Sequence, residues 1–112
     1  MSAMFIACYP RPADGKYKFD LDYYLNVHMP MQLKHHRPHG MRSYHVIQPT
    51  PESPYVIQTV EYWDSLEGIE KAIADFSADL YADIPKYTDI TNAFPIKAVI
   101  KSSHVEPGFV IE

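Results

Sequence analysis

Cysteine and glycine are scarce in this sequence, and each shortage excludes a class of protein. The single cysteine, Cys8, rules out an internal disulfide framework and a cysteine-rich zinc site. The four glycines form no glycine-rich phosphate loop, so no nucleotide cofactor is expected. We therefore expect a protein without a cofactor and interpret Cys8 as a buried core residue.

Basic charge and long hydrophobic runs are lacking as well. The 10 Lys and Arg residues against 14 Asp and Glu residues give a net charge of −4, with no basic stripe for nucleic acid. The apolar run at the N-terminus stops at Pro10, which is too short for a signal peptide or a membrane span. We expect a cytoplasmic protein that binds neither nucleic acid nor membranes.

The composition that remains is that of a globular domain. Hydrophobic residues make up 46% of the 112 residues and aromatic residues 13%. This length suits one domain with one core, so we treat residues 1–112 as a single domain. The 10 prolines fall mostly between apolar segments and mark their boundaries.

Four strand-like runs alternate with two helical patterns. The first helix is expected to start after Asp20 as N-cap, to kink or break near residues 26–30 because of Pro30, and to stop by Gly40. Asp64 and Glu67 have capping-box spacing at the start of a second helix, which should run to Pro85. The strand-like runs are residues 4–9, 42–48, 55–63 and 94–101.

The resulting order, β-α-β-β-α-β, predicts an α+β, ferredoxin-like fold. In this fold a four-stranded antiparallel sheet carries two helices on one face. Residues 55–63 are apolar on both faces, whereas a face in water should be polar. Since the chain has no third helix to cover the second face, we expect a homodimer in which two sheets pack face to face. The apolar tail at residues 105–111 would clasp the partner.

The sequence also resembles a known family, EthD (ethyl tert-butyl ether degradation). The resemblance begins with Tyr9-Pro10-Arg11, continues through Phe19-Asp20, Tyr23-Tyr24 and His28-Met29-Pro30, and extends over about residues 4–102. Trp63-Asp64-Ser65, Asp83 and Tyr87-Thr88 also fit the family pattern. The resemblance implies a dimeric α+β barrel, with a cavity between the sheet and helices of each subunit. It also implies an association with xenobiotic degradation or with steps in aromatic polyketide pathways.

His28 is the best candidate for chemistry. On a regular helical wheel it lies on the apolar face, one turn beyond Tyr24. A buried, neutral imidazole can act as a general base or acid, with Tyr24 donating a hydrogen bond to an oxygen. The alternative is a structural histidine that holds the helix on the sheet. The residues expected on this face are Leu21, Tyr24, Leu25, His28, Met31, Gln32 and His35, opposite Asp22, Asn26, Met29 and Leu33.

Four further residues are candidates for substrate binding. Tyr23, Met31 and Gln32 accompany His28 on the first helix, and Glu61 lies in the most apolar strand. Glu61 either lines the cavity as an acid or base, or is exposed at an edge or paired with arginine. Asp83 is more typical of a turn-forming carboxylate before Pro85.

The histidines at the end of the first helix do not indicate a metal site. His35 and His39 have the i, i+4 spacing of helical zinc pairs, but Pro38 lies between them and no Glu follows His35. We interpret His35, His36 and His39 as solvated histidines near a helix C-terminus.

Three functional hypotheses follow. The first is a small cofactor-free enzyme, such as a lyase, isomerase or oxygenase, acting on an apolar or aromatic carbonyl compound by proton transfer. The second is a non-catalytic accessory protein that binds a hydrophobic metabolite in a degradation pathway. The third is a structural homodimer in which the cavity is filled. The first two predict an open, aromatic-lined cavity at His28.

Overall fold

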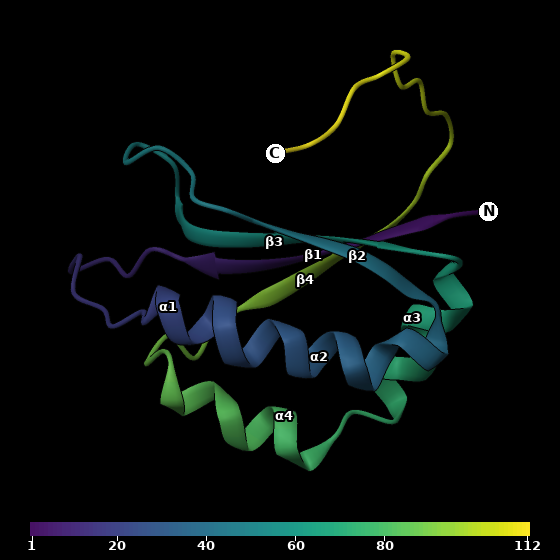
Figure 1. Cartoon of the computed structure of the whole chain (residues 1–112). Coiled ribbons are helices and arrows are strands. Elements are labelled where there is room, and N and C mark those ends of the chain that lie inside the picture. Colours follow the sequence, from purple (N-terminus) through teal and green to yellow (C-terminus); the bar gives the residue numbers. More distant parts are fainter.

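The computed structural model describes residues 1–112 and has the predicted ferredoxin-like architecture. A four-stranded antiparallel sheet, in the order β2-β3-β1-β4, carries all the helices on one face (Figure 1). The elements in chain order are β1 (Ala3–Pro10), α1 (Leu21–Tyr23), the π-helix η1 (Tyr24–His28), α2 (Met29–His36), the 3-10 helix η2 (Arg37–His39), β2 (Met41–Ile47), β3 (Tyr55–Trp63), α3 (Leu66–Ala74), α4 (Ala78–Asp83), the 3-10 helix η3 (Ile84–Lys86) and β4 (Phe94–Val99).

The first helical segment contains a π turn where a kink or break was predicted. Asp20 is the N-cap, as expected, and its carboxylate accepts a hydrogen bond from the Tyr23 N–H at 3.1 Å. The Met29 N–H reaches back five residues to the Tyr24 carbonyl. Because Pro30 supplies no N–H to the helix ladder, a widened turn is accommodated just before it. The helix is therefore continuous, and Gly40 in the left-handed region (φ 105°) ends it.

Two predictions for the second helical segment were wrong. Its N-cap is Ser65, which accepts from the Gly68 N–H at 3.0 Å, while Asp64 pairs with Arg42. The single helix predicted to reach Pro85 is two helices, α3 and α4. The break occurs because the hydroxyl of Ser77 caps α4, and serine competes well for such N–H groups outside a helix.

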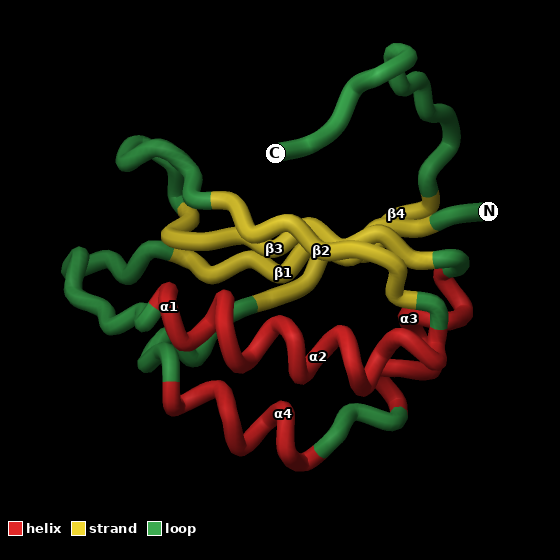
Figure 2. Tube along the Cα trace, in the orientation of Figure 1, coloured by secondary structure: helices red, strands yellow, loops and turns green.

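The sheet has one covered and one open face. Side chains alternate along β1 and β3, so Phe5 and Glu61 face the helices while Ile6 and Val60 face away. Figure 2 shows no helix on this second side, where the C-terminal segment extends from β4. β4 ends at Val99, two residues earlier than predicted, and the apolar tail side chains are exposed. No helix of the structure has the length and hydrophobicity needed to cross a membrane.

Candidate functional site

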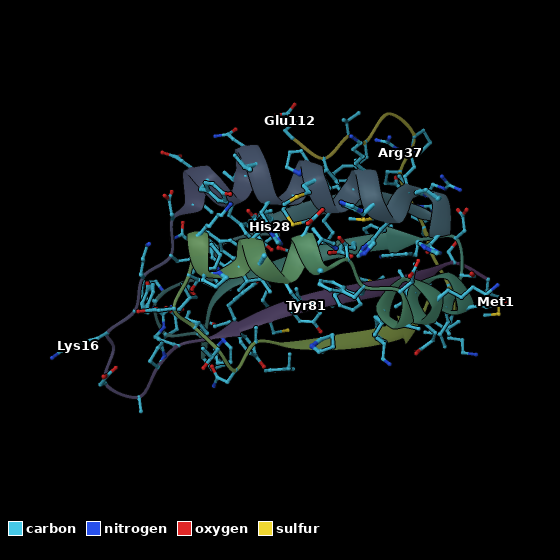
Figure 3. All side chains as sticks on the ribbon, turned by 90° about the horizontal axis from the view of Figure 1, so that it is seen from below. Met1, Lys16, His28, Arg37, Tyr81 and Glu112 are labelled. Atoms are coloured by element: carbon cyan, nitrogen blue, oxygen red, sulfur yellow. The ribbon has the colours of Figure 1, made fainter.

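An apolar pocket lies between the covered face of the sheet and the helices. Its volume is about 280 Å³, and 14 of its 19 lining residues are hydrophobic. Tyr81 is 64% exposed, and Ile73 and Phe94 are also exposed, so the pocket reaches the surface where these three residues line it. Figure 3 shows His28 between the first helix and α4, with Tyr81 on the side of α4 towards the strands. The open, aromatic-lined cavity expected at His28 is present.

Three polar side chains of the first helix line this pocket at intervals of one turn: His28, Gln32 and His36. Beyond the π turn, the buried face differs from the one predicted by a regular wheel, because the π turn holds one extra residue and rotates the helix after it. Gln32 still lines the pocket as predicted, whereas Met31 and His35 do not. Met29, expected opposite, is fully buried, and His36 is buried where His35 was expected.

His28 forms a buried pair with Asp83. Its Nδ1 lies 2.9 Å from Asp83 Oδ2, and the two side chains are 6% and 5% exposed. Tyr23 donates a hydrogen bond to the other carboxylate oxygen at 2.5 Å. An ionised carboxylate only accepts hydrogen bonds, so it fixes the proton of a neutral His28 on Nδ1. The Nε2 lone pair is then free on the other side of the ring.

The electrostatics of this pair suit a base. Burial lowers the pKa of His28, although Asp83 works in the opposite direction through its hydrogen bond and charge. Burial alone would raise the pKa of Asp83, but hydrogen bonds from Tyr23 and His28 outweigh burial and the pKa is lowered. At neutral pH the pair is therefore a neutral imidazole held by a carboxylate, the arrangement that orients a general base.

Tyrosines surround the free side of His28. The ring of Tyr24 is stacked on the imidazole, with centroids 5.5 Å apart, and its hydroxyl is hydrogen-bonded to Thr59 at 2.6 Å. The hydroxyl nearest to Nε2 belongs to Tyr87, at 3.5 Å, and it contacts the Tyr9 hydroxyl at 2.8 Å. Since 3.5 Å is too long for a strong hydrogen bond, Nε2 remains available to a ligand.

Glu61 is a second buried acid in the pocket, and it is neither exposed at an edge nor paired with arginine. It is 1% exposed, and it accepts hydrogen bonds from Gln32 at 2.8 Å and from Trp63 at 3.1 Å. Burial raises the pKa of Glu61 to about 7, against the two hydrogen bonds that favour the charged form. Near neutral pH, Glu61 is thus poised between a hydrogen-bond donor and a charged acceptor.

The burial of Glu61 gives this residue a contribution to stability that falls as the pH rises. The folded state holds this proton up to about pH 7, whereas an unfolded glutamate loses it near its ordinary value of 4.5. The stabilisation is complete below pH 4.5 and lost as the pH rises through 7, a cost of roughly 3 kcal/mol. The lowered pKa values of buried histidines act in the opposite direction, so the measurement is the difference in stability between the wild-type protein and Glu61→Gln, in which the histidine contributions cancel. This difference should shift against the wild-type protein between about pH 4.5 and 7 in calorimetric melting curves. A difference that does not change with pH would contradict the assignment.

His36 was wrongly predicted to be a solvated histidine. It is 6% exposed, lines the pocket, and packs against Trp63 and Phe76 at centroid distances of 5.6 and 5.9 Å. Neither ring nitrogen has a hydrogen-bond partner. Burial, followed by the nearby His39 and His35, lowers the pKa of His36 to about 4, so the ring is neutral at pH 7.

The structure brings together most of the predicted site residues, but not all of them. His28, Tyr24, Gln32 and Glu61 line the pocket. Tyr23 does not line the pocket, but its hydroxyl donates a hydrogen bond to Asp83, the partner of His28. Met31 is half-buried and lies outside the lining.

Sequence reasoning missed three residues of the candidate site. Asp83 was wrongly interpreted as a turn-forming carboxylate, since it is buried and pairs with the side chains of Tyr23 and His28. Tyr87 had no assigned role, and the family pattern, which contains both residues, was the signal that could have found them. His36 had no sequence signal, because its burial depends on the π turn that precedes it.

No group of three or more His, Cys, Asp or Glu side chains is arranged to hold a metal ion. The fold and this site together define a ferredoxin-like α+β protein with a His–Asp pair at an apolar pocket. No family model matches the sequence, and no curated protein is significantly similar to it.

Solved structures provide closer comparisons. An EthD-like protein from Ralstonia eutropha JMP134 is 25% identical, with a TM-score of 0.73 over 91% of this chain and 96% of the other. A dimeric ferredoxin-like protein from an uncultured marine organism is 14% identical, with a TM-score of 0.61 over 94% and 99%. A mutant form of a cofactor-independent oxygenase from Streptomyces nogalater is 6% identical, with a TM-score of 0.59 over 91% and 95%. These comparisons confirm the predicted resemblance to the EthD family and the ferredoxin-like fold.

Proposed function

We propose that this protein is a small, cofactor-free enzyme that moves a proton on an apolar or aromatic carbonyl compound. The observation that carries the proposal is the His28–Asp83 pair at the wall of an apolar pocket. A polar pair of this kind is costly to bury and is not needed to fill a core. Perturbed titratable groups in such a pocket are typical of a catalytic site.

The reaction step follows from the geometry of the pair. Nε2 of His28 takes a proton from the carbon next to a carbonyl, and the C–H electron pair moves onto the carbonyl oxygen to give an enolate. Asp83 stabilises the imidazolium that forms. A hydroxyl of Tyr87 or Tyr24 donates a hydrogen bond to the enolate oxygen. Where a C=C bond is conjugated with the enolate, return of the proton from the imidazolium to the γ-carbon gives isomerisation. Where the substrate has a β-hydroxyl group, the imidazolium gives the proton to that group as it leaves, and loss of water gives dehydration.

The test is exchange of the α-hydrogens of 2-tetralone, a ketone whose ring is fused to a benzene ring, in deuterated water. We expect the protein to accelerate exchange above the buffer rate, in proportion to protein concentration, as followed by NMR. Binding is measured in the same samples from changes in protein chemical shifts. Bound tetralone without acceleration would refute the enzyme and support an accessory protein that binds a hydrophobic metabolite.

We also infer that the working unit is a homodimer joined through the open face of the sheet. Met4, Ile6, Val60 and Tyr62 are only partly buried there, and Ile96 is exposed beside Ile6. The C-terminal tail extends on this same side (Figure 1). An apolar sheet face left in water is unfavourable, and a second copy provides a surface of the same kind.

A further inference from the structure

The pocket has two polar ends, and the proposed chemistry uses only one of them. His28 and His36 are eight residues apart on the same helix, which corresponds to about 12 Å along its axis. Gln32 lies between them and contacts Glu61 on the sheet. The rings packed against His36 are those of Trp63 and Phe76, and the pocket lining also includes the apolar Ile69 and Ala72.

His36 is the buried polar side chain whose nitrogens form no hydrogen bond within the protein. Both of its nitrogens are buried without a partner, whereas Glu61, Gln32, Tyr24 and His28 all have one. Leaving a buried polar group unpaired is unfavourable, so a histidine at this position gains from a ligand that supplies the missing partner. A neutral imidazole offers one donor and one acceptor, which matches a hydroxyl or carbonyl oxygen.

We propose that His36 is a substrate-recognition residue that hydrogen-bonds a second oxygen of an aromatic ligand, at the end of the pocket remote from His28. The substrate class is a compact aromatic compound oxygenated at both ends, since the volume is at the lower limit of ligand pockets. The imidazole reaches the ligand by turning about its Cβ–Cγ bond, which is a soft torsion. This inference rests on the proposed function, because it places a ligand in the same pocket.

The experiment compares two probes, 2-naphthol and 2,6-dihydroxynaphthalene, by titration calorimetry. We expect the wild-type protein to bind the diol about tenfold more tightly than the mono-ol, the gain expected when a buried polar group acquires its partner. His36→Phe keeps an aromatic ring but no nitrogen, and should reduce the preference to less than twofold. His35→Phe, which replaces the exposed neighbouring histidine, is the matched control and should keep the preference.

A second measurement does not depend on any variant folding. In the wild-type protein, the ring ¹⁵N signals of His36 should shift on addition of the diol. A diol preference that persists in His36→Phe, or His36 signals that do not respond to the diol, would overturn the recognition role while leaving the proposed function intact. Failure of the wild-type protein to bind either probe would overturn the proposed ligand pocket, and this inference with it.

Discussion

Replacing His28 by glutamine should lower the tetralone exchange rate about 10²- to 10⁴-fold, the usual contribution of a positioned general base. The glutamine amide can still donate a hydrogen bond to Asp83, so the carboxylate is not left unpaired in the core. Tetralone binding and the melting temperature should therefore change little. The measurement is the NMR exchange rate of the variant at saturating ketone, compared with the wild-type protein.

The matched control for this variant is His35→Gln. His35 is on the same helix but is exposed and does not line the pocket. Its replacement should leave the exchange rate unchanged. Equal rates for His28→Gln and the wild-type protein would show that any acceleration arises elsewhere, and a histidine that only holds the helix on the sheet would then account for the buried pair.

Replacing Asp83 by asparagine should also lower the tetralone exchange rate. In the proposed mechanism Asp83 positions His28 and does not contact the substrate. Asparagine at position 83 can present its NH₂ group to Nδ1, which favours the tautomer with the proton on Nε2 and so blocks the base. The rate should fall by at least about 10²-fold. The remaining activity should have its pH midpoint below that of the wild-type protein, because the carboxylate that raises the pKa of His28 is gone. A purely structural carboxylate would lower stability without this shift of the pH profile.

The fold was largely predictable because it is set by local patterns. The β-branched and aromatic run at Tyr55–Trp63 predicted the central strand β3 with its observed bounds, and Asp20 predicted the start of the first helix. The wrong predictions of helix boundaries occurred where two neighbouring residues can cap a helix with similar free energies, or where a helix can start again within the segment. Ser65 is as good an N-cap as its neighbour Asp64, and Ser77 offered a new helix start that a pattern of apolar spacing does not detect.

The site was less predictable, because it depends on contacts across long stretches of sequence. His28 was found from its place on the helix, but its partner Asp83 is 55 residues away. The π turn displaced the face that follows it, so that His36 replaced His35 in the interior and Met31 moved away from the pocket lining. A wheel of constant periodicity cannot anticipate such a shift.

The second large predicted effect is loss of the inferred dimer when the open face of the sheet is changed. In the inferred dimer, Val60 lies near the centre of the interface, between Ile6 of β1 and His45 of β2. Two such faces packed together would bury on the order of 2,000 Å² or more, an area typical of permanent dimers. The exposed apolar tail, which includes Phe109 and Ile111, lies on the same side and can extend the contact.

Val60→Glu should therefore convert the protein to a monomer. A carboxylate on each copy would be buried next to its symmetry-related counterpart, so the dissociation constant should rise at least about 10³-fold. Sedimentation velocity at micromolar concentration measures this directly. The matched control is Val27→Glu, the same substitution at an exposed position on the outer side of the first helix, which should remain dimeric. A wild-type protein that sediments as a monomer, or a Val60→Glu variant that stays dimeric, would show that the open face does not join two copies.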